Sequence, residues 1–350
     1  MVESLSRRLM GWWGARHERG QGTGVPNKQI SVLFYRDFQY FTGGHLKVWH
    51  YYEHVRHTPG YRPLIAFSPT SRWDDTNPWL PQRDRVLSRW DPWQADLLFL
   101  AGMDWLMWGE EARRSPPRPV INLIQHVRHA NPDETLFGFL SYPALRICVS
   151  AEVEQALRET GRINGPLMTI PNGIARDDLP HDLPWAAREV DVLVLGIKQP
   201  ALATKLSHAV KQAGWRVDAV LTPVPRREFL RRLARSRMAL LLPNPTEGFY
   251  LPALEGMALG TLVICPDCVG NRAFCIPGHN CLQPPYRAEK LLDGIKEAFS
   301  WAPEFSEAVR ARGRDTALRH SLDRERQAFA VVIQQFVTTG SAMLETVDSH

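Results

Sequence analysis

The sequence predicts an α/β protein made of two doubly wound domains with parallel sheets. From Gln29 onward, short apolar runs of strand length alternate with longer stretches of helix length. Six such runs precede residue 171, and at least four follow residue 189. Because buried parallel strands read as continuous apolar runs, this rhythm indicates repeated strand-helix units. A chain of 350 residues is also long enough for two domains.

The predicted strands can be read directly from the sequence. Those of the first domain are, in order, ISVLFY, PLIAF, DLLFLA, VINLIQ, LRICVS and LMTIP. Those of the second domain are VDVLVLG, RVDAVL, MALLLP and TLVICP. Between the two sets lies NGIARDDLPHDLPWAAREV, which is rich in Pro, Asp and Arg, and residues 286–337 carry helical patterns after the last strand. This order favours a linker in the middle of the chain and helices at its end.

The predicted organisation has five parts. They are a basic N-terminal extension (1–28), a first Rossmann-like domain on the acceptor side (29–173), a linker (174–188), a second, nucleotide-sugar-binding Rossmann-like domain (189–320), and a C-terminal helix and tail that can pack back on the first domain (321–350). Ligands of such sheets bind beyond the carboxyl ends of the strands. We therefore expect the site in a cleft that the two domains face.

Composition narrows the class of protein. The chain is 44% hydrophobic and 23% charged, and it has a net charge of +5 and a pI near 9.0, which suits anionic partners. It has no apolar run of about 18 residues and no signal-peptide pattern. Four of its five cysteines crowd into one segment, unlike a secreted disulfide framework. We therefore expect a cytoplasmic protein with reduced thiols.

The N-terminal extension has two readings. Leu5, Leu9, Trp12 and Trp13 fall on one helical face with arginines nearby, as in a helix that lies at a membrane surface. Gly11 and Gly14 within the same stretch weaken a helix and favour a disordered or loosely packed basic extension. Peripheral contact with the inner membrane face is thus one expectation, and the sequence leaves both readings open.

The stretch NPTEGFYLPALEGMALG places two carboxylates around a turn that opens a helix. Glu247 lies in a loop after a strand that ends near Pro243, while Pro252 fits the first helical turn and Gly260 fits the helix end. Glu255 lies about one turn inside the helix. Its carboxylate suits the vicinal hydroxyls of a ribose, and Glu247 suits the hydroxyls of a sugar. Compensation of the helix dipole on a solvated face is the simpler alternative.

The turn itself is a predicted phosphate site. Free amides at a helix N-terminus, together with the positive end of the helix dipole, favour a phosphate or a diphosphate. The predicted contributors are Gly248, Phe249, Tyr250 and Leu251. Combined with the two glutamates, this spacing predicts a nucleotide diphosphate-sugar as the ligand.

The E-x7-E spacing and the following EGMALGTLVICPDCVGNRAFCIPGHNCLQP closely resemble the nucleotide-sugar half of retaining GT-B glycosyltransferases of the family 4 type. The resemblance covers approximately residues 29–335 and is sharper in the second half. It implies transfer of a sugar from a nucleotide diphosphate-sugar to an acceptor hydroxyl, with retention of anomeric configuration. It also implies carbohydrate biosynthesis, no metal, and no cofactor beyond the donor. The acceptor, which could be a saccharide, a lipid-linked molecule or a small molecule, is not identified.

Further segments carry the resemblance. TGGHLKVWH resembles the glycine-rich loop in which Gly43 and Gly44 let backbone amides approach the donor phosphate. LIQHVRHA resembles the loop that lines the donor sugar, with His126 as the better match and His129 as the second choice. CVGNRAFCIPGHNCL adds Asn271 as a further candidate. A turn that needs small residues, or a satisfied structural histidine, would explain the same residues without function.

One position departs from the family pattern. The family has an arginine and then a lysine after the first strand of the second domain, and both neutralise the diphosphate, whereas this chain has Ile197 in VLGIKQPALATKL. The available cations are Lys198 and Lys205, and Lys205 fits the lysine position better. The resemblance therefore implies His126, Glu247 and Lys205 as catalytic residues, with Lys198 as a donor-binding residue. Glu247 is not assigned as a nucleophile.

Several alternatives stay open. A phosphorylase or pseudo-glycosyltransferase can share this fold, and a catalytically silent nucleotide-sugar-binding protein would fit the departure at residue 197. Nucleic-acid binding lacks a recognisable module, and RREFLRRLARSR reads as the solvated face of a helix. The cysteines and His279 imitate a zinc spacing, but cysteines at buried strand ends favour core packing; they are Cys265, Cys268, Cys275 and Cys281.

Overall fold

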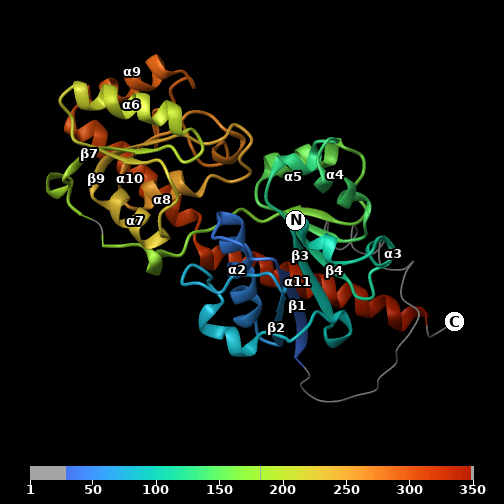
Figure 1. Ribbon diagram of the computed structural model, residues 1–350. Coiled ribbons are helices and arrows are strands. Elements are labelled where there is room, and N and C mark those ends of the chain that lie inside the picture. Colours follow the sequence, from blue (N-terminus) through green and yellow to red (C-terminus); the bar gives the residue numbers. More distant parts are fainter. Residues whose placement is uncertain (1–28, 182, 348–350) are drawn as a thin grey trace. The chain divides into compact units, whose positions relative to one another are not determined.

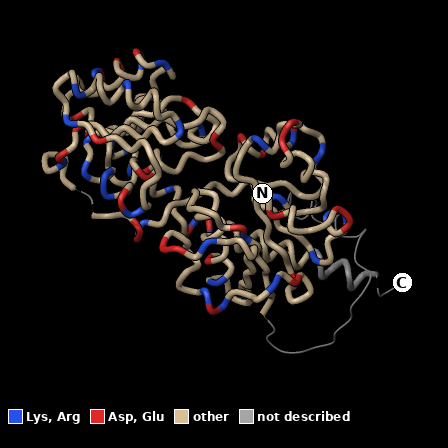
Figure 2. The backbone as a smooth tube through the Cα atoms, in the orientation of Figure 1, with Lys and Arg blue, Asp and Glu red and all other residues tan. Residues whose placement is uncertain are grey.

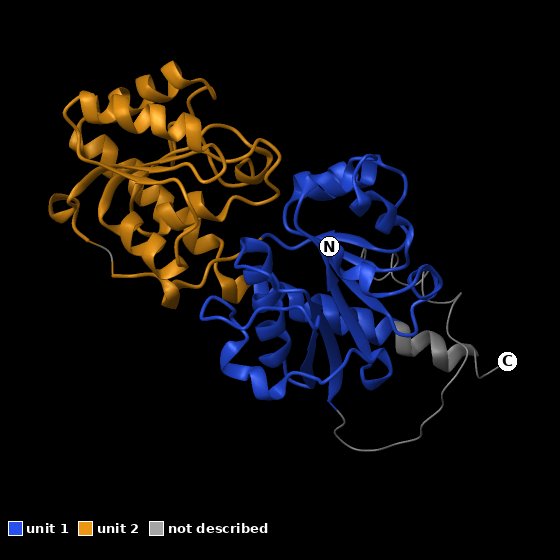
Figure 3. Cartoon of the chain, in the orientation of Figure 1, with its two compact units in different colours: residues 1–171, 325–350 blue, residues 172–324 orange. Residues whose placement is uncertain are grey.

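The computed structural model of the chain describes residues 29–181 and 183–347 (Figure 1). The expected extension over residues 1–28 lies outside the described residues, and so do both readings of it. The chain divides into two compact units. Unit 1 comprises residues 1–171 and 325–350, and unit 2 comprises residues 172–324 (Figure 3). The C-terminal segment thus belongs to the first unit, although it follows the second in sequence.

Unit 1 contains a six-stranded sheet in the order β2-β1-β3-β4-β5-β6, and all its neighbouring strands are parallel. The six apolar runs predicted for the first domain form these strands. Their bounds are β1 Ile30–Arg36, β2 Tyr61–Phe67, β3 Leu97–Ala101, β4 Val120–Ile124, β5 Leu145–Cys148 and β6 Leu167–Thr169. Every residue of β3, β4 and β5 is buried, as expected for strands covered on both faces.

The helices of unit 1 connect and cover this sheet. They are α2 (Gly43–Arg56), α3 (Glu110–Arg114), α4 (Thr135–Gly138), α5 (Ala151–Glu159) and the long α11 (Leu322–Val347), which begins in unit 2 and continues into unit 1. Aromatic contacts fill the space between α2, β3 and α11. Phe99 stacks on Phe34 with ring centroids 4.6 Å apart, and Tyr51 meets Phe329 of α11 edge to face at 5.0 Å.

A buried ion pair joins α2 to α11. Lys47 Nζ lies 2.5 Å from Glu325 Oε2, and the two side chains are 1% and 0% exposed. The other carboxylate oxygen of Glu325 lies 3.3 Å from His54 Nε2, and Lys47 Nζ lies 3.1 Å from His50 Nδ1. Although burial raises the pKa of Glu325, the nearby ammonium and imidazole more than offset this, so its pKa is lowered overall.

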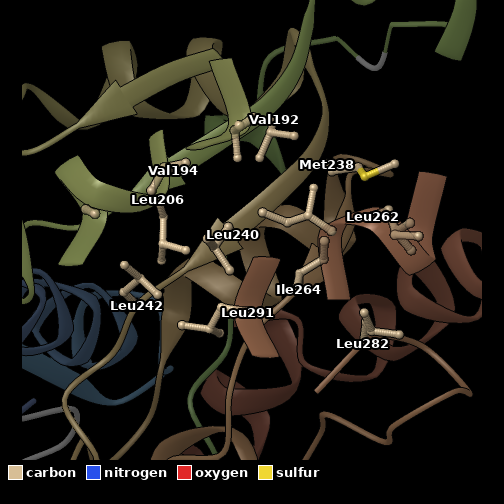
Figure 4. Packing of buried hydrophobic residues seen from close by; sticks show 14 of the residues in the cluster. Val192, Val194, Leu206, Met238, Leu240, Leu242, Leu262, Ile264, Leu282 and Leu291 are labelled. Atoms are coloured by element: carbon tan, nitrogen blue, oxygen red, sulfur yellow. The ribbon is translucent and has the colours of Figure 1, made fainter. Parts of the chain in front are cut away.

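Unit 2 contains a four-stranded parallel sheet in the order β10-β9-β7-β8. The four predicted runs form its strands, which are β7 Val190–Leu195, β8 Val217–Val220, β9 Ser236–Leu241 and β10 Leu262–Ile264. Its helices are α6 Pro200–Gln212, α7 Arg226–Ala234, α8 Leu251–Ala258, α9 Ala288–Ser300 and α10 Pro303–Arg319. Alternate strand residues such as Val192, Val194 and Leu240 pack with Leu206 of α6 and Leu291 of α9 in one core (Figure 4).

Residues 172–174 of unit 2 run beside the junction of α10 and α11. The Ile174 amide donates to the His320 carbonyl at 2.9 Å, and the Leu322 amide donates to the Ile174 carbonyl at 3.0 Å. A Cβ atom on Gly173 would lie 2.4 Å from the carbonyl oxygen of Ser321. Glycine is needed here because two backbone segments approach each other closely.

The predicted linker packs on unit 2 through Arg188, which is 1% exposed. Its guanidinium donates to the carbonyl oxygens of Ser236 and Leu259 and to the hydroxyl of Thr261. In the view of Figure 2, Lys and Arg are interspersed with Asp and Glu along both units. No helix in the described part of the chain combines the length and apolar character needed to cross a bilayer.

Candidate functional site

The topology of unit 2 identifies one edge of its sheet as a binding position. From the first strand, β7, the chain passes to β8 on one side and then to β9 on the other. A crevice opens beyond the carboxyl ends of the strands at such a reversal. Gly196, Ile197 and Lys198 follow β7, and Glu247 lies in the loop after β9. Two residues that the sequence singled out independently therefore meet at this edge.

Lys198 and Glu247 form an ion pair there, with Nζ 3.2 Å from Oε1. The lysine side chain is 50% exposed and the glutamate side chain 16% exposed, so the pair is open to water mainly from the lysine side. Glu247 Oε1 is buried and has no partner with hydrogen-bond geometry among the described residues. The Lys198 ammonium therefore balances the charge of the carboxylate without forming a directional hydrogen bond to it. A hydroxyl could therefore still donate to this oxygen.

Glycine at position 196 sets the path of the chain between β7 and α6. A Cβ atom there would lie 2.0 Å from the Cβ of Ala203, so the strand end and the helix pack in close contact. The buried face of α6 consists of Ala203, Leu206 and Val210. Lys205 falls outside this face and is exposed, and it is Lys198 that forms the ion pair with Glu247. The predicted role of Lys205 stays a prediction.

The helix that carries Glu255 has the predicted ends. Pro252 lies in the first turn of α8, and Gly260 follows its C-cap with φ of +61°, a conformation that favours glycine. The expectation of free amides at residues 248–251 is wrong for Tyr250 and Leu251. The Tyr250 amide donates to the Gly270 carbonyl at 2.8 Å, and the Leu251 amide donates to the Phe249 carbonyl at 3.2 Å. Both donors are used by backbone carbonyls, which leaves the amides of Gly248 and Phe249 as the candidate phosphate contacts.

Glu255 is 2% exposed and forms an ion pair with Arg226, the first residue of α7. This partner was not predicted from the sequence, because the arginine-rich stretch reads as the solvated face of a helix. That reading is wrong for Arg226, whose side chain is only 20% exposed. The available signal was its place directly after Pro225, at the carboxyl end of β8, where a ligand-facing residue is expected.

The loop after β10 packs against the turn that carries Glu247. A Cβ atom on Gly270 would lie 2.8 Å from the Glu247 carbonyl oxygen and 2.8 Å from the Phe249 amide nitrogen. Asn271 is fully buried, donates to the Pro266 carbonyl at 2.9 Å and accepts from the Cys268 amide at 3.2 Å. Asn271 therefore holds the loop that supports the Glu247 turn, and its predicted contact with the donor stays a prediction.

All five cysteines are buried and free of disulfides. Burial raises the pKa of the Cys268 thiol to about 12, so the neutral thiol prevails at neutral pH. In residues 29–181 and 183–347, no group of three or more His, Cys, Asp or Glu side chains is placed to hold a metal ion.

In unit 1 the glycine-rich segment forms the N-terminus of α2, capped by the Thr42 side chain, which accepts from the His45 amide at 3.2 Å. A Cβ atom on Gly43 would meet no atom within 4 Å, so this end of the helix is open. Gln125 Nε2 donates to the Gly44 carbonyl at 3.3 Å, which brings the predicted glycine loop beside the residue that precedes His126. The structure thus joins these two predicted segments within one unit.

The two predicted histidines differ in environment. His126 is half-buried, and its Nδ1 accepts from the Arg128 amide at 3.0 Å, capping a short 3-10 helix. His129 is 4% exposed, and burial lowers its pKa to about 3. Its Nδ1 is buried and has no hydrogen-bond partner among the described residues. The roles of both histidines stay predictions.

A polar cluster that the sequence analysis missed lies at the start of α2. Arg36, the last residue of β1, pairs with Asp104 at 2.7 Å and donates to His45 Nδ1 at 3.3 Å. Burial lowers the pKa of His45 to about 3, with the nearby Arg36 as the second cause. Burial also raises the pKa of Asp104 to about 6, although Arg36 opposes this. The cluster fixes the first turn of α2 relative to the ends of β1 and β3.

Solved structures with the same fold are found across most of the chain. A sucrose-phosphate synthase from Thermosynechococcus elongatus matches with a TM-score of 0.66 and 13% identity, over 89% of this chain and 100% of that one. HepE from Anabaena, solved with UDP and glucose, matches with a TM-score of 0.62 and 14% identity, over 92% and 100%. A glycosyltransferase from Rickettsia africae matches with a TM-score of 0.60 and 12% identity, over 88% and 99%.

No family model and no curated protein sequence matches the chain. The structural likeness therefore rests on the arrangement of the elements rather than on sequence. It shows that the chain has the GT-B fold of glycosyltransferases, as the sequence predicted.

Proposed function

We propose that this protein is a retaining glycosyltransferase that moves a sugar from a nucleotide diphosphate-sugar to an acceptor hydroxyl without a metal ion. The observation that carries the proposal is the Lys198–Glu247 pair at the strand reversal of unit 2, with Glu255 one helical turn inside α8. A sugar nucleotide has a diphosphate that suits the lysine and hydroxyls that suit the two carboxylates. The fold supports the proposal, because HepE, which shares it, was solved with UDP-glucose.

Each residue has a part in the proposed donor complex. Lys198 balances charge on the diphosphate, and the Phe249 amide at the turn before α8 donates to a phosphate oxygen. Glu247 accepts from hydroxyls of the donor sugar, and Glu255 accepts from the ribose. The roles of Gly43, Gly44, His126 and Lys205 remain predictions from the sequence.

The proposed chemistry uses positioning and charge rather than a protein nucleophile. The bond between the anomeric carbon and the diphosphate breaks, and the acceptor hydroxyl forms its bond to the same face of that carbon. The acceptor proton passes to a departing phosphate oxygen. Lys198 stabilises the charge that develops on the leaving diphosphate, where fixed cations and amides lower the barrier most.

A donor screen tests the proposal. UDP-, GDP- and ADP-sugars are screened for protection of the protein against thermal unfolding and for slow release of the nucleoside diphosphate, with Glu247→Gln and Glu255→Ala as variants. We expect one donor to stabilise the wild type and to be hydrolysed slowly, and both variants to lose hydrolysis. A donor that protects but is never turned over, with or without sugar acceptors, would indicate a silent binding protein. Release of a sugar phosphate only when inorganic phosphate is present would indicate a phosphorylase.

A further inference from the structure

We propose that Arg226 and Glu255 together form a reader of the ribose cis-diol, and that Arg226 sets selectivity for ribonucleotide over 2′-deoxyribonucleotide donors. The inference rests on the proposed function and adds a specificity residue to it. Arg226 comes from the carboxyl end of β8, and Glu255 lies inside α8. The two meet at the same edge of the sheet as Lys198 and Glu247.

The ion pair uses only part of each side chain. Its contact joins Arg226 Nη1 to Glu255 Oε1. Glu255 Oε2 has no hydrogen-bond partner among the described residues and is not fully enclosed. Arg226 Nη2 likewise has no partner in the described part of the chain and is not fully enclosed, whereas Nε is buried. The carboxylate therefore keeps an unused acceptor and the guanidinium keeps an unused donor.

Unused polar groups at a buried ion pair are costly unless a ligand satisfies them. A carboxylate that is 2% exposed loses most of its hydration, which costs free energy in the unliganded protein unless its oxygens are hydrogen-bonded. The position of Arg226 adds to this cost, because a cation at the first residue of a helix faces the positive end of the helix dipole. An arginine retained for solubility would not need this burial.

A cis-diol matches the unused groups. Each hydroxyl has one donor and two acceptor positions, so one hydroxyl can donate to Glu255 Oε2 while the neighbouring oxygen accepts from the guanidinium. A carboxylate can only accept, so the guanidinium adds the donor that the second oxygen of a diol can use. A site built for a hydroxyl rejects the analogue that lacks it, because its own polar groups are then left buried without partners.

The test compares UDP with 2′-deoxy-UDP, and GDP and ADP with their 2′-deoxy forms, by calorimetric titration. The proteins are the wild type, Arg226→Gln, Arg226→Lys and Arg227→Gln. Arg227 is the matched control, because it is the next residue of the same helix, carries the same charge and is exposed. Arg226→Lys keeps the charge and provides a second variant if Arg226→Gln does not fold.

We expect the wild type to bind the ribonucleotide about ten- to a hundredfold more tightly than the 2′-deoxy form, in line with hydrogen bonds to charged groups. The ratio should fall to about threefold or less in Arg226→Gln, fall partway in Arg226→Lys, and persist in Arg227→Gln. An unchanged ratio in both Arg226 variants, or equal binding of the two nucleotides by the wild type, overturns the inference and leaves the proposed function standing. Failure of the wild type to bind any of the nucleotides overturns the proposed function as well.

Discussion

The buried Lys47–Glu325 pair gives the most quantitative prediction about the fold. Glu325→Gln keeps the shape of the side chain but removes its charge, and it leaves an ammonium that is 1% exposed without its counter-ion. Breaking one side of a buried pair typically costs about 3–5 kcal/mol. We expect a loss of this size in the free energy of unfolding of unit 1, because both residues lie within it.

The double variant Lys47→Met with Glu325→Gln separates the pair from its surroundings. Removing both charges avoids an uncompensated ion, so the double variant should be about as stable as the better single variant or more stable. The coupling energy in the double-mutant cycle should then be about 3 kcal/mol. The matched control is Glu53→Gln on the same helix, whose partner Arg56 is 44% exposed and which should cost less than about 1 kcal/mol.

Urea unfolding followed by tryptophan fluorescence measures these changes. Nine of the twelve tryptophans precede residue 172, so their fluorescence reports mainly on the unfolding of unit 1. The two units need not unfold in one transition, and this signal follows the unit that contains the ion pair. At pH 7 the contribution of the pair is present, and it is lost as the pH falls through the lowered pKa of Glu325, below about 4.5. If Glu325→Gln lowers the free energy of unfolding no more than Glu53→Gln does, the conclusion that a buried ion pair stabilises the contact of α11 with α2 is wrong.

Three further outcomes follow from the contacts above. Gly173→Ala should destabilise unit 2 by about 2–4 kcal/mol in urea unfolding, because its Cβ would overlap backbone atoms, and Gly138→Ala, where a Cβ meets no atom within 4 Å, should not. Lys198→Ala should weaken UDP binding about tenfold in calorimetric titration, and Lys205→Ala should weaken it less. The reverse order would contradict the assignment of Lys198 as the cation that binds the diphosphate. Since the pKa of Asp104 is raised to about 6, its contribution to stability is full below pH 3.8 and lost as the pH rises through 6; Asp104→Asn should abolish this slope of about 3 kcal/mol at most in unfolding experiments across that range.

The strands and the α8 turn could be predicted because their signals are local. Ten apolar runs became ten parallel strands, and the proline and glycine around Glu255 fixed both ends of its helix. Glu247 and Lys198 could be named separately, since each follows a strand. Their ion pair could not be derived from spacing, because it depends on which strands become neighbours, and β7 pairs with β9 although β8 lies between them in sequence.

The missed residues share one physical reason. Arg226 is 29 positions from Glu255, and Lys47 is 278 positions from Glu325. In each case the local pattern reads as an ordinary charged helix face, and only tertiary packing turns the charge inward. The prediction that the Tyr250 amide is free was wrong for a related reason. The carbonyl that accepts from this amide belongs to Gly270, which lies in a later loop.

The buried cysteine thiols can report local unfolding of the protein, because they react only when the structure around them opens. Cys148 lies in unit 1, and the other four cysteines lie in unit 2 around the loop that supports Glu247. A thiol reacts as its thiolate and only when reagent can reach it, so brief alkylation followed by peptide mass analysis would time the opening of each unit separately. A nucleotide that binds beside Glu247 should slow the labelling of Cys268 and leave that of Cys148 unaffected, which turns a packing detail into a ligand assay that needs no acceptor and no turnover.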